Sequence, residues 1–247
     1  MRLDVYLAET GILSSRTEAK RFIDEGAVFV DGAQVLKASF DVSGSEDKIF
    51  VDRSIKKYVS RGGIKLQGAL TTFGVDPFGK KCLDVGASSG GFTDCLLQAG
   101  ACHVISVDSG SGQIAEILRA DSRVTVMENY NARYMNREDF DYDPDLVVMD
   151  VSFISATYII PRIFEVLLPG GEFICLIKPQ FEVGRQGLGK GGIVKDDKAR
   201  DTAVKKVVDF AAETGFLILN LIQSPIKGGD GNIEFLAHFL KKGEDKE

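Results

Sequence analysis

The chain has 247 residues, of which 44% are hydrophobic and 27% charged, and its mean hydropathy is close to zero. This is the composition of a globular protein with room for one large and one small domain. It has no apolar run of about 18 residues and no apolar signal core, so we expect a cytoplasmic protein without stable membrane association.

Cysteine and histidine usage argues against a metal site and against a disulfide framework. The chain has four cysteines, which form no C-x-x-C pair and mostly lie in apolar runs. This predicts buried, reduced thiols. The two histidines, His103 and His238, are too few for a histidine metal centre, so we expect no metal. His103 lies within a predicted strand, which also disfavours a Ser/His/Asp triad.

The formal net charge of −6 argues weakly against a nucleic-acid partner, but the charge is unevenly distributed. Residues 53–73 carry five basic side chains and no acidic one, and residues 178–195 carry four basic side chains against Glu182 alone. Local basic stretches can contact phosphates whatever the total charge. These stretches are therefore candidate phosphate contacts, although solvated lysine-rich loops would show the same pattern.

The first 52 residues predict a small α+β unit. An amphipathic helix covers about residues 3–11, and Ser14-Ser15 cap a second helix over 16–25. Residues 27–30 predict a strand, followed by the hairpin-turn pair Asp31-Gly32. Further short strands are indicated by the apolar residues Val35, Phe40, Val42, Ile49 and Val51.

Segment 15–32, Ser-Arg-Thr-Glu-Ala-Lys-Arg-Phe-Ile-Asp-Glu-Gly-Ala-Val-Phe-Val-Asp-Gly, resembles the S-four-type RNA-binding domain. We assign residues 1–52 to this domain and residues 53–61 to a linker. The resemblance implies that the basic face of its helix and turn meets RNA. The residues on that face are Arg2, Arg16, Lys20 and Arg21.

After the linker, the chain alternates between predicted strands and helices, which is typical of an α/β domain with a parallel sheet covered on both faces. One helix begins at Gly62-Gly63, and the amphipathic stretch 197–214 predicts another. Strand candidates are 81–85, 102–107, 124–127, 146–149, 173–177 and 216–222. A turn at 228–231 and a final strand at 233–239 predict a closing antiparallel hairpin. The domain then covers 62–241, and 242–247 form a flexible tail.

The first of these strands runs into a glycine-rich turn, Asp84-Val-Gly-Ala-Ser-Ser-Gly-Gly-Phe-Thr93, which opens a predicted helix. Glycines let the backbone approach a ligand, and a helix N-terminus presents free N–H groups. The pattern lacks the G-x-G-x-x-G spacing expected around a pyrophosphate. It resembles the first motif of S-adenosylmethionine-dependent methyltransferases, whose fold is a Rossmann-like seven-stranded sheet ending in an antiparallel hairpin. The resemblance implies cofactor contacts from Asp84, Gly86, Ser88, Gly90, Gly91 and Phe92.

Polar residues also end the second and third strands of this sheet. Asp108 lies about 20 residues after the glycine turn, where an acid can hydrogen-bond both hydroxyls of a ribose. Glu128 and Asn129 end the third strand, where polar side chains can meet an adenine. Two other glycine patterns compete with this interpretation. Loop 184–192 reads G-x-x-x-x-G-K without the Ser or Thr of a P-loop, and 110–115 keeps a dinucleotide-dependent oxidoreductase as a minor alternative.

Four charged residues stand at separate points of the predicted sheet. Asp150 ends the fourth strand and Lys178 the fifth, so both side chains reach the cleft at the carboxyl edge. Lys65 lies on the helix before the first strand, and Glu234 lies in the closing hairpin. Alone, Lys65 or Glu234 would be read as a solvated surface charge. Together the four residues match, in order and context, the Lys-Asp-Lys-Glu tetrad of the FtsJ-like ribose 2′-O-methyltransferases.

The whole chain resembles the hemolysin A/TlyA branch of that group, including 58–63 (Tyr-Val-Ser-Arg-Gly-Gly) and 224–228 (Ser-Pro-Ile-Lys-Gly). The resemblance implies methyl transfer from S-adenosylmethionine to a ribose 2′-hydroxyl, with cytidine as the base. The implied partner is ribosomal RNA or a ribosomal subunit, contacted also by Arg61, Arg185 and Lys190. The family name keeps a membrane-acting cytolysin as an alternative, and a non-catalytic RNA-binding factor is a third.

The tetrad suggests a chemical hypothesis. A ribose hydroxyl is a poor nucleophile near neutral pH, so transfer needs accurate positioning and a base. A lysine can act as a base where burial and a neighbouring cation favour its neutral form. We expect Lys178 to be the base or to orient the hydroxyl, with Lys65 as the neighbouring cation. Asp150 would then hold Lys178 and favour the sulfonium, and Glu234 would fix Lys65.

Overall fold

The computed structural model describes residues 1–24, 26–45, 48–52, 58–184 and 187–243. The chain divides into two compact units, Met1–Lys57 and Tyr58–Glu247, and each is described by itself. The second unit begins within the expected linker, before Gly62. The reason is that the Tyr58 side chain is buried and the Val59 N–H donates to a carboxylate oxygen of Asp94 at 2.7 Å.

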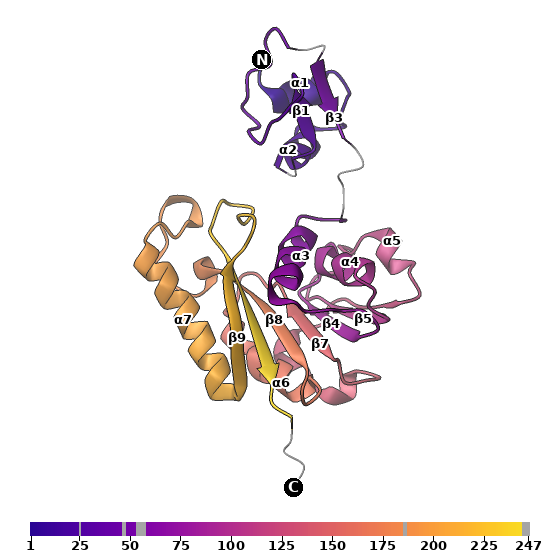
Figure 1. The fold of residues 1–247 in the computed structure, drawn as a ribbon, viewed down its shortest axis with the longest axis vertical. Helices are drawn as coiled ribbons and strands as arrows, with labels where there is room; N and C mark the ends of the chain where they lie inside the picture. The colour runs from indigo at the N-terminus through magenta and orange to yellow at the C-terminus, as the bar shows by residue number, and fades with distance from the viewer. Residues whose placement is uncertain (25, 46–47, 53–57, 185–186, 244–247) are drawn as a thin grey trace. The chain divides into compact units, whose positions relative to one another are not determined.

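The first unit combines two helices with a three-stranded sheet (Figure 1). Its elements are α1 (Leu3–Glu9), α2 (Arg16–Asp24), β1 (Val28–Val30), β2 (Ala33–Gln34) and β3 (Ile49–Val51). The sheet order is β2-β1-β3, and both pairs of strands are antiparallel. Asp31 and Gly32 join β1 to β2 with φ angles of 51° and 76°. Positive φ at both positions is what a two-residue hairpin turn between twisted strands requires.

Two local predictions for this unit had different outcomes. Ser15 caps α2 as expected, because its Oγ accepts the Glu18 N–H at 3.1 Å. The strand expected around Phe40 and Val42 is wrong, since the structure has no named strand in this stretch of the described chain. Val42 is nevertheless fully buried, so its side chain contributes to the core from a loop.

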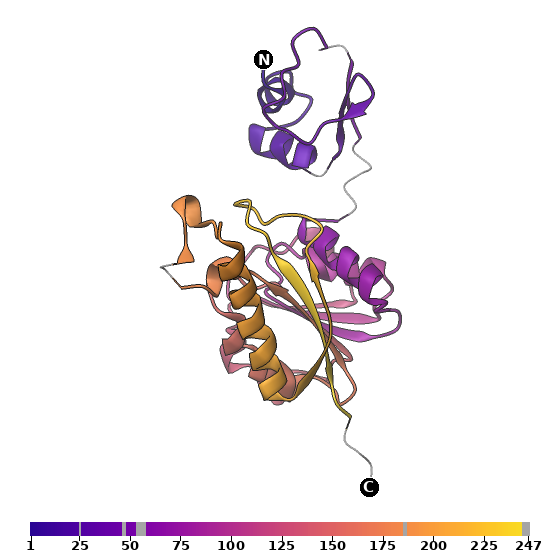
Figure 2. The same cartoon turned by 60° about the vertical axis from the view of Figure 1, so that its left-hand side comes forward.

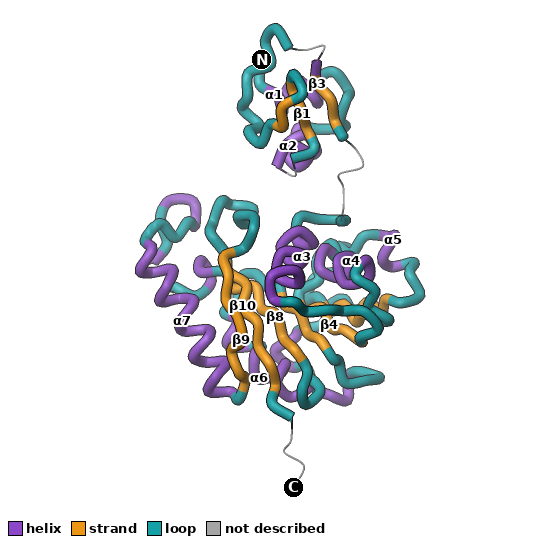
Figure 3. Tube along the Cα trace, viewed as in Figure 1, coloured by secondary structure: helices purple, strands orange, loops and turns teal. Residues whose placement is uncertain are grey.

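The second unit is built on one seven-stranded sheet with the order β6-β5-β4-β7-β8-β10-β9. Its strands are β4 (Lys81–Val85), β5 (His103–Val107), β6 (Val124–Met127), β7 (Leu146–Met149), β8 (Glu172–Ile177), β9 (Phe216–Gln223) and β10 (Phe235–Lys241). Strands β4 to β8 pair in parallel, whereas β10 is antiparallel to both β8 and β9. Figure 3 shows the strands of this sheet in orange, with helices beside them in purple. This confirms the predicted Rossmann-like sheet with its closing hairpin.

The last strand is displaced from its predicted range, because it begins at Phe235 and ends at Lys241. The strand starts late because the buried side chain of Asn232 bonds to the backbone of loop 192–194. The chain before Phe235 is therefore tied to a loop. The strand extends to Lys241 because the backbone of that residue bonds to the turn at 170–171.

Helices cover both faces of the sheet (Figures 1 and 2). One face packs against α3 (Gly62–Phe73), α4 (Gly91–Gln98) and the short α5 (Glu116–Arg119), and the other against α6 (Ile160–Val166) and α7 (Asp197–Thr214). Successive residues of a strand point to opposite faces of the sheet and therefore belong to different cores. Val148 packs with α3 and α4, whereas Val147 packs with α6 and α7. Both faces are thus apolar, which explains the continuous apolar runs in the sequence.

Short 3-10 helices follow three of the strands at their carboxyl ends: η3 (Ala132–Tyr134) after β6, η5 (Ala156–Tyr158) after β7 and η6 (Pro179–Phe181) after β8. Two more are η4 (Arg137–Asp139) and η8 (Lys190–Gly192). The chain order reverses between β4 and β7. Open α/β sheets bind ligands outside the carboxyl ends of the strands at such a reversal. The site is therefore expected where these irregular segments gather.

Candidate active site

Strand register brings three of the predicted site residues to one edge of the sheet. Strands β4, β5 and β7 end together, because Val85 is the partner of both Val107 and Met149. The residue that follows each strand therefore lies at the same edge of the sheet, beside the point where the chain order reverses. These residues are Gly86, Asp108 and Asp150.

The antiparallel pair β8–β10 brings two more charged residues to this edge. Ile177 is the partner of Phe235 in that ladder, so Lys178 and Glu234 leave it at the same end. The fourth charged residue, Lys65, reaches the centre from α3, and its side chain is buried. Residues that are far apart in the sequence therefore meet because of the sheet register.

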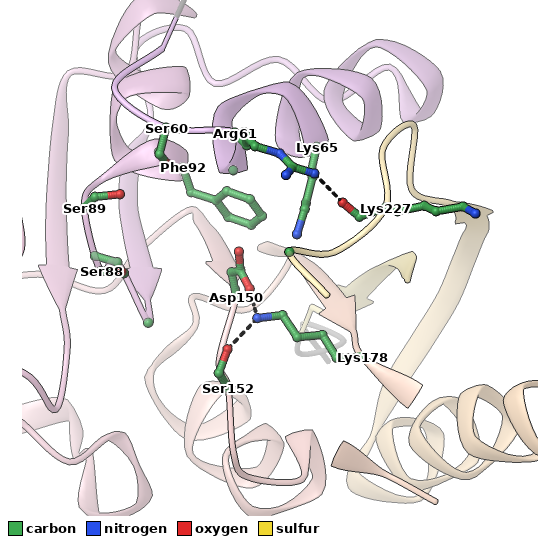
Figure 4. Close-up of a pocket in the computed structure, with 15 residues that line it drawn as sticks. Ser60, Arg61, Lys65, Ser88, Ser89, Phe92, Asp150, Ser152, Lys178 and Lys227 are labelled. Atoms are coloured by element: carbon green, nitrogen blue, oxygen red, sulfur yellow. Dashed lines mark hydrogen bonds and ion pairs between the residues drawn. The ribbon is translucent and has the colours of Figure 1, made fainter. Parts of the chain in front are cut away.

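The four charged residues form two ion pairs. Figure 4 shows the pair between Lys178 and Asp150. Lys178 Nζ lies 2.5 Å from Asp150 Oδ1 and donates a hydrogen bond to Ser152 Oγ at 2.7 Å. Lys65 Nζ donates to Glu234 Oε2 at 2.6 Å, and both of these side chains are buried. Each lysine is thus held by one carboxylate, and the two lysines with Asp150 line one cavity.

Two adjoining cavities share Asp150, one member of these ion pairs. The larger, of about 590 Å³, lies over the ends of β4, β5 and β7, and the smaller, of about 260 Å³, lies between α3 and the glycine turn. Both are lined by Gly86, Ser88, Asp150 and Ser152. Gly91 and Phe92 line the smaller one. A ligand in the larger cavity would therefore border the Lys178–Asp150 pair.

Two glycines of the turn are required, Gly86 by a close backbone approach and both by their positive φ. Gly86 has φ of 85°, and a Cβ there would lie 2.6 Å from the Asp150 carbonyl oxygen. Gly90 has φ of 91°, and its Cβ would lie 2.2 Å from the Leu118 side chain. Gly86 therefore lets two strand ends approach beside both cavities. Gly90 lines neither cavity and instead lets α4 begin close against α5.

Asp84 lies behind the turn and lines neither cavity. Its Oδ2 accepts the Thr93 N–H at 2.9 Å and the Thr93 hydroxyl at 2.7 Å, which ties β4 to the start of α4. Burial raises the pKa of Asp84 from 3.8 to about 7, and the Thr93 hydrogen bonds oppose this rise. Asp84, which the sequence predicts as a cofactor contact, therefore supports the turn in the structure and does not border either cavity.

The Asp84 carboxyl should make stability depend on pH. The folded state holds its proton up to about pH 7, whereas the unfolded chain releases it near pH 3.8. Because the folded state binds more protons in this window, the free energy of unfolding should fall as the pH rises through it. Asp84→Asn cannot ionise and should lose less stability than the wild type between about pH 5 and about pH 8. Urea unfolding at the two pH values measures this, and equal losses would contradict it.

Asp108 faces the larger cavity as the sequence predicts. Its Oδ2 accepts the Ser88 N–H at 2.8 Å, and its Oδ1 accepts the Gly110 N–H at 2.7 Å. These bonds fix the carboxylate at the cavity wall. Each carboxylate oxygen has a second lone pair, so the group can still accept hydrogen bonds from a ligand.

The other two predicted contacts, Glu128 and Asn129, do not line the larger cavity, whereas Tyr130 and Asn131 do. The chain turns at Asn129, which has φ of 54°. The Glu128 carboxylate accepts from Arg119 at 2.9 Å, and this hydrogen bond lowers the pKa of Glu128. The polar side chain available to a ligand here is therefore Asn131, two residues beyond the expected position.

Sequence reasoning missed two residues that follow Asp150. Ser152 bonds to Lys178, and its spacing of two in an extended segment could have placed it on the same side as Asp150. Phe153 has φ of 64° and is 91% exposed, with its ring centroid 5.2 Å from that of Phe181. Positive φ in a bulky residue is strained and marks candidate functional sites. Phe153 therefore offers an exposed ring in the lining of the larger cavity.

Two protein-family models match this chain. Residues 58–241 match the FtsJ-like methyltransferase model, and residues 1–49 match the S4 domain model. The chain belongs to the FtsJ-like methyltransferase family. Both resemblances drawn from the sequence are thereby confirmed, one from the tetrad and the other from segment 15–32.

Individual relatives confirm the resemblance to the hemolysin A/TlyA branch. Hemolysin A of Brachyspira hyodysenteriae is 45% identical over 97% of this chain and 100% of its own length. The 16S/23S rRNA (cytidine-2′-O)-methyltransferase TlyA of Mycobacterium tuberculosis is 41% identical over 95% of this chain and 87% of its own. A solved structure from Streptococcus thermophilus is 40% identical, covers 98% of this chain and 88% of its own, and has a TM-score of 0.76.

In the S4 domain, the predicted RNA contacts Arg2 and Arg16 converge on Asp4. Arg2 Nε lies 2.9 Å from Asp4 Oδ1, and Arg16 Nη2 lies 3.0 Å from Oδ2. Burial alone would raise the pKa of Asp4, but the hydrogen bonds from the two arginines outweigh it and lower the pKa. Both arginine side chains remain more than half exposed. Lys20 is exposed, and Arg21 is paired with an acid on the same helix.

Three further predicted RNA contacts lie in the methyltransferase region. Arg61 lines the smaller cavity and donates to the Lys227 carbonyl oxygen at 2.7 Å. Lys190 is exposed on η8, whereas Arg185 lies outside the described residues. Among the residues that the structure describes, no helix is long and apolar enough to span a membrane. The same residues contain no cluster of three or more His, Cys, Asp or Glu side chains that could hold a metal ion.

Proposed function

We propose that this protein transfers a methyl group from S-adenosylmethionine to the ribose 2′-hydroxyl of ribosomal RNA, with cytidine as the target. The main support for the proposal is the pair of lysine–carboxylate contacts, Lys178–Asp150 and Lys65–Glu234. Both lysines line the smaller cavity, and Asp150 lines both cavities. Ribosomal RNA and cytidine are taken from the activity named for Mycobacterium tuberculosis TlyA. The same positions match the tetrad of ribose 2′-O-methyltransferases.

The residues around the larger cavity fit S-adenosylmethionine. Its volume of about 590 Å³ is suited to a ligand of that class. Asp108 offers a fixed carboxylate to ribose hydroxyls, and Asn131 offers an amide to the adenine. Gly86 keeps open the space beside the Asp150 backbone. When bound, the cofactor supplies an electrophilic methyl group on a sulfonium cation, whose positive charge the Asp150 carboxylate favours.

Lys178 is the group best placed to receive the proton of the target hydroxyl. Asp150 and Ser152 hold its Nζ at one point of the wall that the two cavities share. In its neutral form, Nζ takes the 2′-hydroxyl proton as the oxygen is methylated. Lys65, held by Glu234, presents a second ammonium that can donate to ribose oxygens. Positioning by the two pairs supplies much of the rate.

The remaining basic residues support an RNA partner. Arg2 and Arg16 present two guanidinium groups that Asp4 holds in place, and an arginine so oriented can bind a phosphate with two hydrogen bonds. Arg61 would add a phosphate contact at the smaller cavity, and the exposed Lys190 would add another from η8. We propose free ribosomal RNA or a ribosomal subunit as the substrate. The place of action would then be the cytoplasm, where ribosomes are assembled.

Phe153→Gly should raise stability and lower activity. Glycine relieves the positive φ, which is worth about 1 kcal/mol or more. Loss of the ring removes a stacking surface for an unpaired base, worth about 1–3 kcal/mol, or roughly 5- to 150-fold in kcat/KM. Phe153→Trp keeps the surface and should retain most activity. Urea unfolding and kcat/KM for RNA test both effects, and an unchanged kcat/KM in Phe153→Gly would rule out stacking.

The proposed function is tested by tritium transfer from labelled S-adenosylmethionine to ribosomal subunits that lack the modification. Label in an alkali-resistant dinucleotide is expected, because methylation of the 2′-hydroxyl blocks cleavage at that position. Cofactor binding with no transfer to any RNA would favour a non-catalytic RNA-binding factor. Leakage of liposomes on addition of the pure protein, again without transfer, would favour the cytolysin alternative.

A further inference from the structure

Glu182 is a buried carboxylate near the reaction centre to which the mechanism gives no role. The buried acidic residues in the described chain are Asp4, Asp84, Glu182 and Glu234. Three of them have been accounted for, by the arginine pair, the glycine turn and Lys65. The Glu182 side chain is only 2% exposed. Burying a carboxylate is costly unless it is hydrogen-bonded and paired, so its partners show what it does.

The Glu182 carboxylate binds two neighbouring residues of one segment and a lysine from α7. Its Oε2 accepts the Ser155 hydroxyl at 2.6 Å, and its Oε1 accepts the Ala156 N–H at 2.7 Å. Lys206 Nζ lies 3.2 Å from Oε2 and is half exposed. Hydrogen bonds to a charged acceptor are about twice as strong as neutral ones. The contacts to Ser155 and Ala156 are therefore the main attachment, and Lys206 supplies the opposite charge from the surface.

These contacts join the two segments that carry the Lys178–Asp150 pair. Ser155 and Ala156 lie shortly after Asp150 at the end of β7, and Glu182 directly follows η6, which begins just after Lys178 at the end of β8. The ion pair itself is one link between these strand ends. The Glu182 contacts form a second link, farther from the sheet. Two links fix both the separation and the orientation of the segments, which a single salt bridge cannot do.

The segment held in this way contains a strained residue. Phe153, at φ of 64°, lies between Asp150 and the Glu182 contacts, and its ring packs against Phe181 on η6. Strain of this kind persists only where the surrounding structure over-determines the backbone. The bonds to Ser155 and Ala156 supply that restraint at the far end of the segment.

We propose that Glu182 is a positioning residue of the reaction centre, which holds segment 151–156 against the segment after Lys178 so that Asp150, Ser152 and Phe153 face the substrate. The proposal rests on the proposed function for its catalytic consequence. A small misplacement of a reacting group can cost about 100-fold in rate. Glu182→Gln, which keeps the shape but loses the charge, should therefore lower kcat by roughly 10- to 100-fold. The cofactor affinity should fall by a smaller factor than kcat, because Asp108 and the glycine turn are untouched and only residues 151–154 of the larger cavity's lining are loosened.

The experiment compares Glu182→Gln with two control variants on the full chain. Lys206→Met removes only the half-exposed counter-charge and should change kcat by less than about fivefold. Val204→Ala makes a cavity in the core under α7, so it lowers the thermal midpoint but should leave kcat per folded molecule unchanged. A loss in Glu182→Gln no larger than that in Val204→Ala would overturn the proposal, because it would then reflect stability alone.

Hydrogen–deuterium exchange gives a readout that does not need activity. In Glu182→Gln, the amides of residues 151–158 should exchange faster than in the wild type, and in Lys206→Met they should not. Unchanged exchange in Glu182→Gln would overturn the positioning role even if the wild type is an active methyltransferase. If the wild type transfers no methyl group, the proposed function fails, and faster exchange would still establish that Glu182 holds the segment.

Discussion

Replacing Lys178 with alanine is expected to lower methyl transfer by roughly 100- to 10,000-fold, the usual effect of losing a general base. The side chain reaches the junction of the two cavities, where Asp150 and Ser152 hold its Nζ. Binding of the cofactor should change little, because Asp108 lines the larger cavity and Lys178 lines only the smaller one. Tritium transfer measures the first quantity, and isothermal titration of S-adenosylmethionine measures the second.

Lys178→Arg separates the two roles that a lysine can have at this point. Arginine keeps the positive charge and the pairing with Asp150 but does not lose its proton in proteins. A base role predicts that Lys178→Arg is nearly as inactive as Lys178→Ala, whereas a purely orienting role predicts substantial activity. Lys205→Ala is the matched control, since Lys205 is an exposed lysine on α7 paired with Asp209. Full activity in Lys178→Ala would remove Lys178 from the mechanism altogether.

The central strands and the long helix could be predicted because their signals are local. Strands β4, β6 and β7 occupy their predicted ranges. Each is rich in apolar residues and is bounded by polar residues or glycine. Helix α7 also has its predicted range, with Asp196 capping its first turn and Gly215 ending it at φ of 115°. The carboxyl ends of parallel strands meet at one edge, so the positions of Asp108 and Asp150 followed from the fold class.

Features that depend on backbone conformation between elements could not be predicted. The turn at Asn129 shifts the cavity contact to Asn131. Asparagine tolerates positive φ, but its presence in the sequence does not show that this position adopts it. Phe153 has a positive φ, which bulky residues, unlike glycine, rarely adopt. The pairing of Lys65 with Glu234 depends on contacts between α3 and the closing hairpin, and these residues are separated by most of the chain. The tetrad was found because it matches a family pattern, which local signals do not supply.

Glu234→Ala is expected to cost about 3–5 kcal/mol of stability, because it leaves the Lys65 ammonium buried without its carboxylate. The side chains of this pair are 9% and 3% exposed, so solvent cannot replace the lost partner. Neutralising the exposed Lys205–Asp209 pair on α7 should cost less than about 1 kcal/mol and is the matched control. Urea unfolding of the two variants compares the costs, and equal values would mean that the Lys65–Glu234 pair is solvated in solution.

The double variant Lys65→Met with Glu234→Leu separates stability from function in the same pair. Apolar side chains of similar volume often replace a buried ion pair without loss of stability, because the desolvation cost of the charges disappears with them. The double variant should therefore recover most of the stability lost in Glu234→Ala. Methyl transfer should remain strongly reduced, since the Lys65 ammonium is then missing from the smaller cavity. Recovery of activity together with stability would show that the pair only supports the fold, and Lys178 with Asp150 would then carry the chemistry alone.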